Sequence, residues 1–274
     1  MMHWILQNNL FREEGWESMT IALDRFKIPY TLVKVVPFSG ELIPEPEPIE
    51  GKVICFGSYS MRHAAKKYNW KPGVYDLYDV DFNAQKEHWG KYMLNTDSVV
   101  CAFKDAILSE PMFVRPANDS KHFSGKVFEV DEFNDWRFGI CTLGHDYGNL
   151  LNPETLVQIN KPVEIWSEYR YWIVDHKIVT KSRYKLGNRI TQSAIVDDRF
   201  DWYVDQVLRT TNNLIDIRLN PIPSGWEPAR AFCLDVCETP DGIKIVEINT
   251  INASGFYAGN IQNLVLALEF MEGR

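Results

Sequence analysis

The 274-residue sequence lacks the features that mark several large classes of protein. It has no internal repeat, no low-complexity tract, and no block or stripe of basic residues of the kind that binds nucleic acid. No apolar stretch is long enough to cross a bilayer, and the apolar run near the first residue is too short for the core of a signal peptide. We therefore expect a cytoplasmic protein whose partners include neither nucleic acid nor a membrane.

Metal-binding and disulfide patterns are also missing. The chain has five cysteines, an odd number, with no C-x-x-C pair, and its six histidines show no zinc-binding spacing. In an extended segment Cys233 and Cys237 would lie about 13 Å apart, which prevents a local bridge. We expect reduced thiols, as in a cytosol. The other cysteines are Cys55, Cys101 and Cys141.

The chain does contain enough apolar material for a substantial core. Hydrophobic residues make up 45% of the sequence, and 37 acidic against 29 basic residues leave a net charge of −8. This length and composition suggest one large domain or two modest ones. A mildly acidic chain can still bind an anionic substrate in a local basic pocket.

The first part of the chain, over roughly 1–108, has the pattern of a small α/β domain. Its order is strand, helix, strand, strand, helix, and we expect the strands on either side of the first helix to be parallel, with a right-handed crossover. The expected strands are 3–8, 30–38 and 52–58, and the expected helices are 13–27 and 61–70.

Beyond Glu110 the pattern changes to strands separated by polar loops. The expected elements are strands at 111–116 and 126–130 around a flexible loop at 117–125, a segment at 154–165 that leads into a strand, a β-hairpin at 168–185 turning at 175–177, a helix at 199–215, a second hairpin within 233–255 and a closing helix at 259–272.

The second hairpin carries an unusual set of polar side chains. Its turn, "TPDG", predicts that Thr239 faces Ile243, which places Asp235 opposite Glu247 with Cβ atoms about 5 Å apart. A β-bulge could move this by one position. Asn249 lies on the same face because strand side chains alternate. Facing carboxylates repel each other, and two carboxylates with an amide oxygen suit Mg²⁺.

A simpler interpretation of this hairpin is an amphipathic strand pair whose polar face is wet. The sequence around the carboxylates favours burial instead, because Asp235 lies in "FCLDVC" and Glu247 in "IVEI". Buried charges need partners or metals.

Several short motifs occur in a fixed order along the chain. "MFVRP" precedes "DSKHFSG", then comes "PVEIWSEYRYWIVDHKIVTKSRYK", and "LDV" and "VEIN" lie on the last two strands. Together they resemble the ATP-grasp superfamily, and especially its clade named for an arginine and two lysines. The resemblance implies an α+β ATP-grasp fold of two lobes that grip ATP, preceded by a pre-ATP-grasp domain. It places a pre-domain at 1–108 and the ATP-grasp domain at 109–274, with a small lobe at about 109–162 and a large lobe at about 163–274.

The resemblance also implies roles for individual residues. It assigns the metal, as one or two Mg²⁺ ions, to Asp235, Glu247 and Asn249, and the ATP phosphates to Arg115 and Lys121. Glu164, Ile165 and Trp166 would read adenine with main-chain groups, and Glu168 would accept the ribose hydroxyls. Arg170, Lys181 and Arg183 would share the inner face of the hairpin and bind phosphate and an acyl phosphate. Asn252, Ser254 and Gly255 would belong to the loop that holds the acceptor.

Each assignment has an ordinary structural alternative. Basic residues on a hairpin usually form a solvated face, Lys121 could be a plain loop lysine, and Glu168 could pair with Arg170 or Arg183. Trp166 favours hinge packing over base stacking, and arginine at position 115 replaces the family's usual lysine, with a different reach.

The activity implied by the resemblance is that of an ATP- and Mg²⁺-dependent ligase. It would phosphorylate a small-molecule or peptide carboxylate and pass the acyl group to an amine, or to a thiol. Two alternatives stay open at this point: a kinase that stops after phosphorylation, and a nucleotide-binding protein without turnover. The acid, the amine and the oligomeric state cannot be deduced from these residues.

Overall fold

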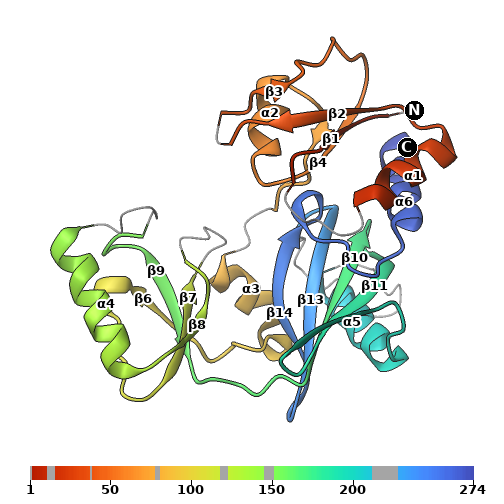
Figure 1. Ribbon diagram of the computed structural model, residues 1–274. Coiled ribbons are helices and arrows are strands. Elements are labelled where there is room, and N and C mark those ends of the chain that lie inside the picture. The colour runs from red at the N-terminus through yellow and green to blue at the C-terminus, as the bar shows by residue number, and fades with distance from the viewer. Residues whose placement is uncertain are drawn as a thin grey trace. The chain divides into compact units, whose positions relative to one another are not determined.

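The computed structural model describes residues 2–10, 16–37, 39–77, 81–117, 123–144, 151–211 and 228–274 (Figure 1). Contacts divide the chain into a first unit, Met1–Tyr78 with Ile165–Arg274, and a second unit, Asp79–Glu164. The expected mixture of helices and sheets is confirmed. The domain boundary at 108 stays a prediction.

The N-terminal sheet of the first unit is mainly parallel. Its strand order is β3-β2-β1-β4-β5, and β1 pairs in parallel with both β2 and β4, which confirms the expected parallel pair. The short β3 joins β2 in the antiparallel direction. The elements are β1 (His3–Gln7), α1 (Trp16–Phe26), β2 (Tyr30–Val35), β3 (Leu42–Ile43), β4 (Val53–Phe56), α2 (Met61–Lys67) and β5 (Pro72–Gly73).

The C-terminal sheet of the first unit is antiparallel, in the order β12-β11-β10-β13-β14. Asp175 and His176 form the turn of its first hairpin with left-handed backbones (φ 44° and 61°), as a two-residue turn between twisted strands requires. The elements are β10 (Ser167–Val174), β11 (Lys177–Leu186), β12 (Arg189–Ser193), α5 (Asp198–Thr211), β13 (Ala231–Thr239), β14 (Gly242–Thr250), the 3-10 turn η3 (Ile251–Ala253) and α6 (Ile261–Gly273).

One hydrophobic core joins the two sheets of the first unit. Trp4 on β1 and Trp172 on β10 belong to the same buried cluster, together with Leu264 on α6. Helices α1 and α6 lie side by side there (Figure 1), and the indole Nε1 of Trp4 donates to Glu269 at 2.8 Å. The ends of the chain are therefore packed together through their side chains.

The two faces of the C-terminal sheet have different neighbours. Helix α5 covers one face, where the Tyr169 and Phe200 rings lie 4.0 Å apart. Helix α6 packs near Trp172 on the opposite face. Arg170 and Asp235 pair directly, and each lies two residues along its strand from Trp172 or Cys233. Because side chains alternate along a strand, Arg170 and Asp235 lie on that second face.

The second unit has its own sheet and core. The strand order is β6-β9-β7-β8, and Phe103, Phe133 and Trp136 pack edge to face beneath it. The sequence analysis assigned no element to α3 or α4. The elements are α3 (Phe82–Trp89), η1 (Gly90–Tyr92), β6 (Val99–Ala102), η2 (Phe103–Asp105), β7 (Met112–Pro116), β8 (Lys126–Phe128), α4 (Val130–Leu143) and β9 (Leu156–Asn160).

Among the residues that the structure describes, none of the helices combines the length and the apolar character needed to cross a membrane.

The shared core predicts a large difference between two leucines on α6. Leu264 is 0% exposed and Leu266 is 46% exposed. We expect Leu264→Ala to lower the free energy of unfolding by about 2–5 kcal/mol, because a buried truncation loses burial and leaves a cavity. Leu266→Ala, the same change at the surface, should cost well below about 1 kcal/mol. Urea unfolding followed by tryptophan fluorescence measures both, and equal costs would contradict this core.

Candidate functional site

Charged side chains from three adjacent strands meet on the α6 side of the C-terminal sheet. Asp235 on β13 pairs with Arg170 on β10 and with Glu247 on β14. Residues paired in this way point to the same face, so the three side chains form a row across the sheet. The predicted pairing of Asp235 with Glu247 is confirmed.

The register that produces this pairing differs from the predicted one near the turn. Thr239 pairs with Gly242, and not with Ile243, so continuing that register would bring Val246 opposite Asp235. A register shift between Asp235 and Val236 inserts one residue into β14 and restores Glu247 as the partner. The bulge therefore decides which β14 side chain faces Asp235.

Arg170 and Asp235 form a buried ion pair. The guanidinium Nε donates to Asp235 Oδ1 at 2.8 Å and Nη2 donates to Oδ2 at 2.7 Å, while the two side chains are 9% and 1% exposed. This two-pronged geometry is the strongest form of an arginine–carboxylate contact. The positive charge expected beside the facing carboxylates is thus supplied by the chain itself.

Burial is the largest influence on the pKa of both partners. It raises the pKa of Asp235 above its ordinary value, against the opposing effect of Arg170. For Arg170, burial lowers the pKa, but the charge and the hydrogen bonds of Asp235, with smaller effects of Cys233 and Tyr257, together outweigh burial and raise the pKa well above the usual range. Arg170 therefore stays charged and holds the Asp235 carboxylate in one orientation.

Asn249 connects the two carboxylates. Its Nδ2 donates to Glu247 Oε1 at 3.0 Å and to Asp235 Oδ2 at 3.3 Å. As arranged, the amide nitrogen faces the acids, and rotation of the amide would turn its oxygen toward them. Each carboxylate oxygen has two lone pairs, so Asp235 keeps acceptor capacity beyond its arginine bonds. An all-oxygen donor set of this kind fits Mg²⁺.

No group of three or more His, Cys, Asp and Glu side chains arranged to hold a metal occurs among the described residues. The candidate set contains two such residues, with Asn249 as the third donor. The case for Mg²⁺ at this set therefore rests on the chemistry of its oxygen donors, two carboxylates and one amide.

Aromatic rings line this face beside the ion pair. Tyr184 and Tyr257 stack with ring centroids 4.9 Å apart, and the Arg170 guanidinium lies 5.1 Å from the Tyr257 centroid. The Tyr184 hydroxyl donates to Glu168 Oε2 at 2.8 Å, and Lys185 donates to Glu168 Oε1. Tyr184, Lys185 and Tyr257 were not among the predicted site residues. A register shift beside Glu168 sets the contacts of Tyr184 and Lys185, and Tyr257 lies in the loop before α6.

Lys181 and Arg183 do not share this face with Arg170. Arg170 pairs with Ser182, whereas Lys181 pairs with Tyr171 and Arg183 with Tyr169. Lys181 also donates to Asp201 on α5. The expectation that the three basic residues share one inner face is therefore wrong, because a bulge in β11 changes the alternation.

The predicted acceptor loop is anchored by its own hydrogen bonds. Asn252 is buried, its Oδ1 accepts from the Tyr75 N–H at 2.7 Å and its Nδ2 donates to the Cys55 carbonyl at 2.5 Å. Ser254 donates to the Thr250 carbonyl at 2.7 Å, and the Gly255 carbonyl accepts from Arg170 Nη1 at 3.4 Å. Asn252 thus ties the loop to the N-terminal sheet.

The remaining predicted residues lie elsewhere in the chain. Trp166, 45% exposed, donates its N–H to the Glu238 carbonyl at 2.8 Å and accepts from the Gly187 N–H at 2.7 Å, so both main-chain groups are engaged. Ile165 begins the C-terminal part of the first unit, and Glu164 is the last residue of the second. Arg115 lies on β7 in the second unit. Lys121 lies outside the described residues.

Several solved structures share the overall fold of this chain, and one of them is named as an ATP-grasp protein. D-alanine–D-alanine ligase from Bacillus anthracis matches with a TM-score of 0.61 at 12% identity, covering 100% of this chain and 98% of that one. D-cycloserine synthetase DcsG matches at 0.60 and 10% identity, covering 98% and 99%. A RimK domain ATP-grasp protein from Sphaerobacter thermophilus matches at 0.55 and 10% identity, covering 98% and 95%. At this identity the likeness shows the fold.

The fold is therefore the ATP-grasp fold, as the motifs predicted. Within it, the chain belongs to an ATP-grasp domain family, family 3 of the clade named for an arginine and two lysines, whose family model matches residues 56–268. This confirms the resemblance found in the sequence. A comparison with curated protein sequences finds no significant match.

The buried ion pair predicts strong coupling between its two residues. Arg170→Met or Asp235→Asn alone should cost about 3–5 kcal/mol of unfolding free energy, because each change leaves a buried charge without its partner. The double variant should cost less than the sum by about 1–3 kcal/mol. A control cycle on the half-exposed pair Lys126–Glu132, with Lys126→Met and Glu132→Gln, should show about 1 kcal/mol or less. Similar coupling in both urea-unfolding cycles would contradict the inferred burial.

Proposed function

We propose that this protein is an ATP- and Mg²⁺-dependent ligase that joins a carboxylate to an amine, or to a thiol, through an acyl phosphate. The observation that carries the proposal is the row of Arg170, Asp235 and Glu247 with Asn249, in a chain of the ATP-grasp family. Two structural neighbours are a ligase and a synthetase by name, and one neighbour was solved in complex with ATP.

In this proposal the chain's residues position the reactants. Glu247, Asp235 and Asn249 would hold Mg²⁺, which when bound supplies positive charge near the transferring phosphoryl group. Arg170 acts as a positioning residue, because two of its nitrogens bind Asp235 and fix that carboxylate. Positioning and charge neutralisation dominate phosphoryl transfer, so no covalent nucleophile of the protein is required.

The other predicted roles are part of the same proposal. Arg115 and Lys121 would contact phosphates, residues 164–166 would contact adenine, and Glu168 would accept ribose hydroxyls alongside Tyr184 and Lys185. Lys181 and Arg183 keep a proposed catalytic role only if they act from the α5 side of the sheet.

Cys233 and Cys237 have no place in this chemistry. Both thiols are buried, and burial raises the pKa of each to about 12. A thiol with such a pKa is protonated at neutral pH and is a poor nucleophile. This supports transfer through a phosphorylated substrate in preference to an enzyme thioester on either residue.

The metal assignment predicts a specific effect of one carboxylate. Glu247→Gln keeps the shape of the side chain but removes its charge, so Mg²⁺-dependent ATP binding should weaken at least about tenfold, equivalent to about 1.4 kcal/mol. Calorimetric titration with ATP, with and without Mg²⁺, measures the change. Asp241→Asn, the same chemical change at the exposed turn of this hairpin, is the matched control and should leave binding unchanged. Equal Mg²⁺ dependence in wild type and Glu247→Gln would remove Glu247 from the site.

The reaction type is tested by the dependence of phosphate release on an amine. We expect release of phosphate from Mg·ATP to require both an acid and an amine from pooled amino acids and peptides, with an amide product detected by mass spectrometry. ATP consumption that yields a stable phosphorylated product without an amine would instead identify a kinase. Tight ATP binding with no product would identify a nucleotide-binding protein, and either result would overturn the ligase.

A further inference from the structure

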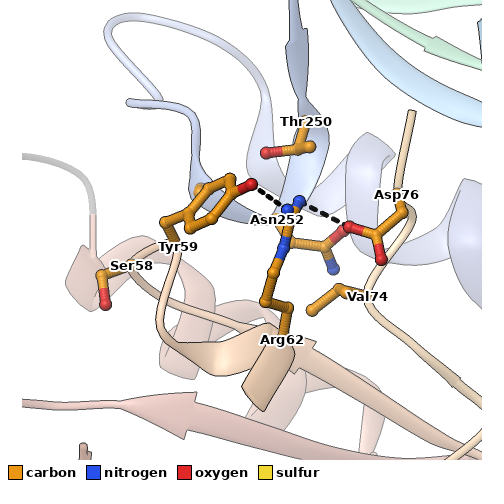
Figure 2. Close-up of a pocket in the computed structure, with 8 residues that line it drawn as sticks. Ser58, Tyr59, Arg62, Val74, Asp76, Thr250 and Asn252 are labelled. Atoms are coloured by element: carbon orange, nitrogen blue, oxygen red, sulfur yellow. Dashed lines mark hydrogen bonds and ion pairs between the residues drawn. The ribbon is translucent and has the colours of Figure 1, made fainter. Parts of the chain in front are cut away.

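A small pocket lies in the first unit where the N-terminal sheet meets the loop after β14 (Figure 2). It opens at the carboxyl end of β4, beside the end of β1. From β1 the chain adds β2 on one side and later β4 on the other, so the order of the parallel strands changes sense between β1 and β4. Ligands of open α/β sheets bind at such a switch point. The pocket is lined by Ser58, Tyr59, Arg62, Val74, Asp76, Thr250, Asn252 and Ala253.

The backbone around this pocket is held tightly. The Gly57 N–H donates to the Asn252 carbonyl at 2.9 Å, and the Ser58 N–H donates to Gln7 Oε1 at 2.8 Å. A Cβ on Gly57 would come within 2.6–2.8 Å of Gln7 and Met61 atoms, so glycine is required for this close approach. The frame of the pocket is therefore preorganised, whereas the charged side chains within it are exposed.

Arg62 and Asp76 dominate the chemistry of the pocket. Arg62 Nη2 lies 2.6 Å from Asp76 Oδ1, and Arg62 Nη1 donates to the Tyr59 hydroxyl, as Figure 2 shows. The two charged side chains are 28% and 52% exposed. An ion pair this exposed contributes only about 0–1 kcal/mol, so a ligand with complementary charges can exchange with it at little cost.

The space that the pair borders is small. The pocket has a volume of about 10 Å³, room for a single water molecule. A neighbouring groove of about 460 Å³ shares Arg62, Val74 and Asp76 as lining residues and adds Lys66 and Trp70. The pocket and the groove therefore meet at these shared residues, and the groove is large enough for a small molecule.

We infer that Arg62 and Asp76 bind the charged head group of a free α-amino acid as the substrate of the proposed ligase. The Arg62 fork, beside the Tyr59 and Ser58 hydroxyls, matches a carboxylate, and Asp76 matches the adjacent ammonium group. A zwitterion replaces each half of the ion pair with its own opposite charge, so neither side chain loses a partner on binding. The inference rests on the proposed function for the fate of the ligand, but not for its binding.

The position of the pocket along β14 bears on which group reacts. Thr250 follows Glu247 by three residues, which is about 10 Å of extended strand. A head group held at Arg62 is then a handle, and the reacting group lies at the other end of the substrate. This favours a ligand whose side chain carries the reacting group over one whose α-group reacts.

Binding without nucleotide tests the site independently of the ligase. Saturation-transfer NMR with a mixture of the twenty L-amino acids and D-alanine identifies a ligand, and titration then compares it with its des-amino analogue and its carboxamide. We expect both analogues to bind at least about tenfold more weakly than the zwitterion, a loss of about 1.4 kcal/mol each. Absence of binding by every amino acid, or equal binding of all three forms, would overturn the inference.

Variants assign each charge to its residue. Arg62→Gln should weaken the amino acid at least about tenfold but leave its carboxamide unaffected, and Asp76→Asn should weaken the amino acid without affecting the des-amino analogue. Lys67→Gln, at an exposed position of the same helix that lines neither the pocket nor the groove, is the control and should bind as wild type. Circular dichroism checks that each variant is folded, and Tyr59→Phe offers a milder perturbation if Arg62→Gln is not. Uniform losses for all ligand forms would contradict the charge assignment.

The outcomes for binding and for turnover separate two failures. Amino-acid binding that depends on Arg62 and Asp76, without amide formation from Mg·ATP, would support the site and overturn the ligase. Amide formation from substrates that lack an ammonium or a carboxylate at the handle, at unchanged KM in Arg62→Gln, would support the ligase and overturn the site.

Discussion

The buried ion pair between Arg170 and Asp235 is the constraint on which the candidate site depends. Asp235 faces Glu247 across the strands, and two carboxylates at this separation would repel strongly in surroundings too dry to screen them. The two-pronged bond from Arg170 offsets that repulsion, and Asn249 bridges what remains. The sheet can therefore present several acidic oxygens on one face and still pack its other residues in a continuous core.

The same unit contains two ion pairs of opposite character. Arg170–Asp235 is 9% and 1% exposed and is costly to break, whereas Arg62–Asp76 is 28% and 52% exposed and is easily exchanged. Asn252, in the loop after β14, binds backbone groups of Tyr75 and Cys55 beside the N-terminal sheet. A buried asparagine therefore fixes the loop after β14 to the N-terminal sheet, beside the pocket that the exposed ion pair lines.

Much of the fold follows from local patterns. The strands β1, β2 and β4 were predicted, β2 from its β-branched content and β4 from its apolar run, and the turn residues predicted both hairpins of the C-terminal sheet. Helices α3 and α4 were not predicted. The aromatic side chain of Trp136 on α4 is stabilised by tertiary contacts with Phe103 and Phe128, which a local sequence pattern does not reveal. The ordered motifs identified the ATP-grasp family because they combine several weak signals from distant strands.

Local sequence patterns are enough to predict which residue types could form the site: two carboxylates and an amide on one hairpin, preceded by a strand with a central arginine. Which of these residues meet depends on the strand registers in the folded sheet. Near the turn of β10 and β11 the register would place Lys181 opposite Arg170, but one bulge moves Ser182 there. Near the turn of β13 and β14 the register would place Val246 opposite Asp235, and one bulge brings Glu247. The physical reason is the two-residue period of a strand, since a single inserted residue exchanges the two faces of the sheet, and the packing of both faces decides where that residue is inserted.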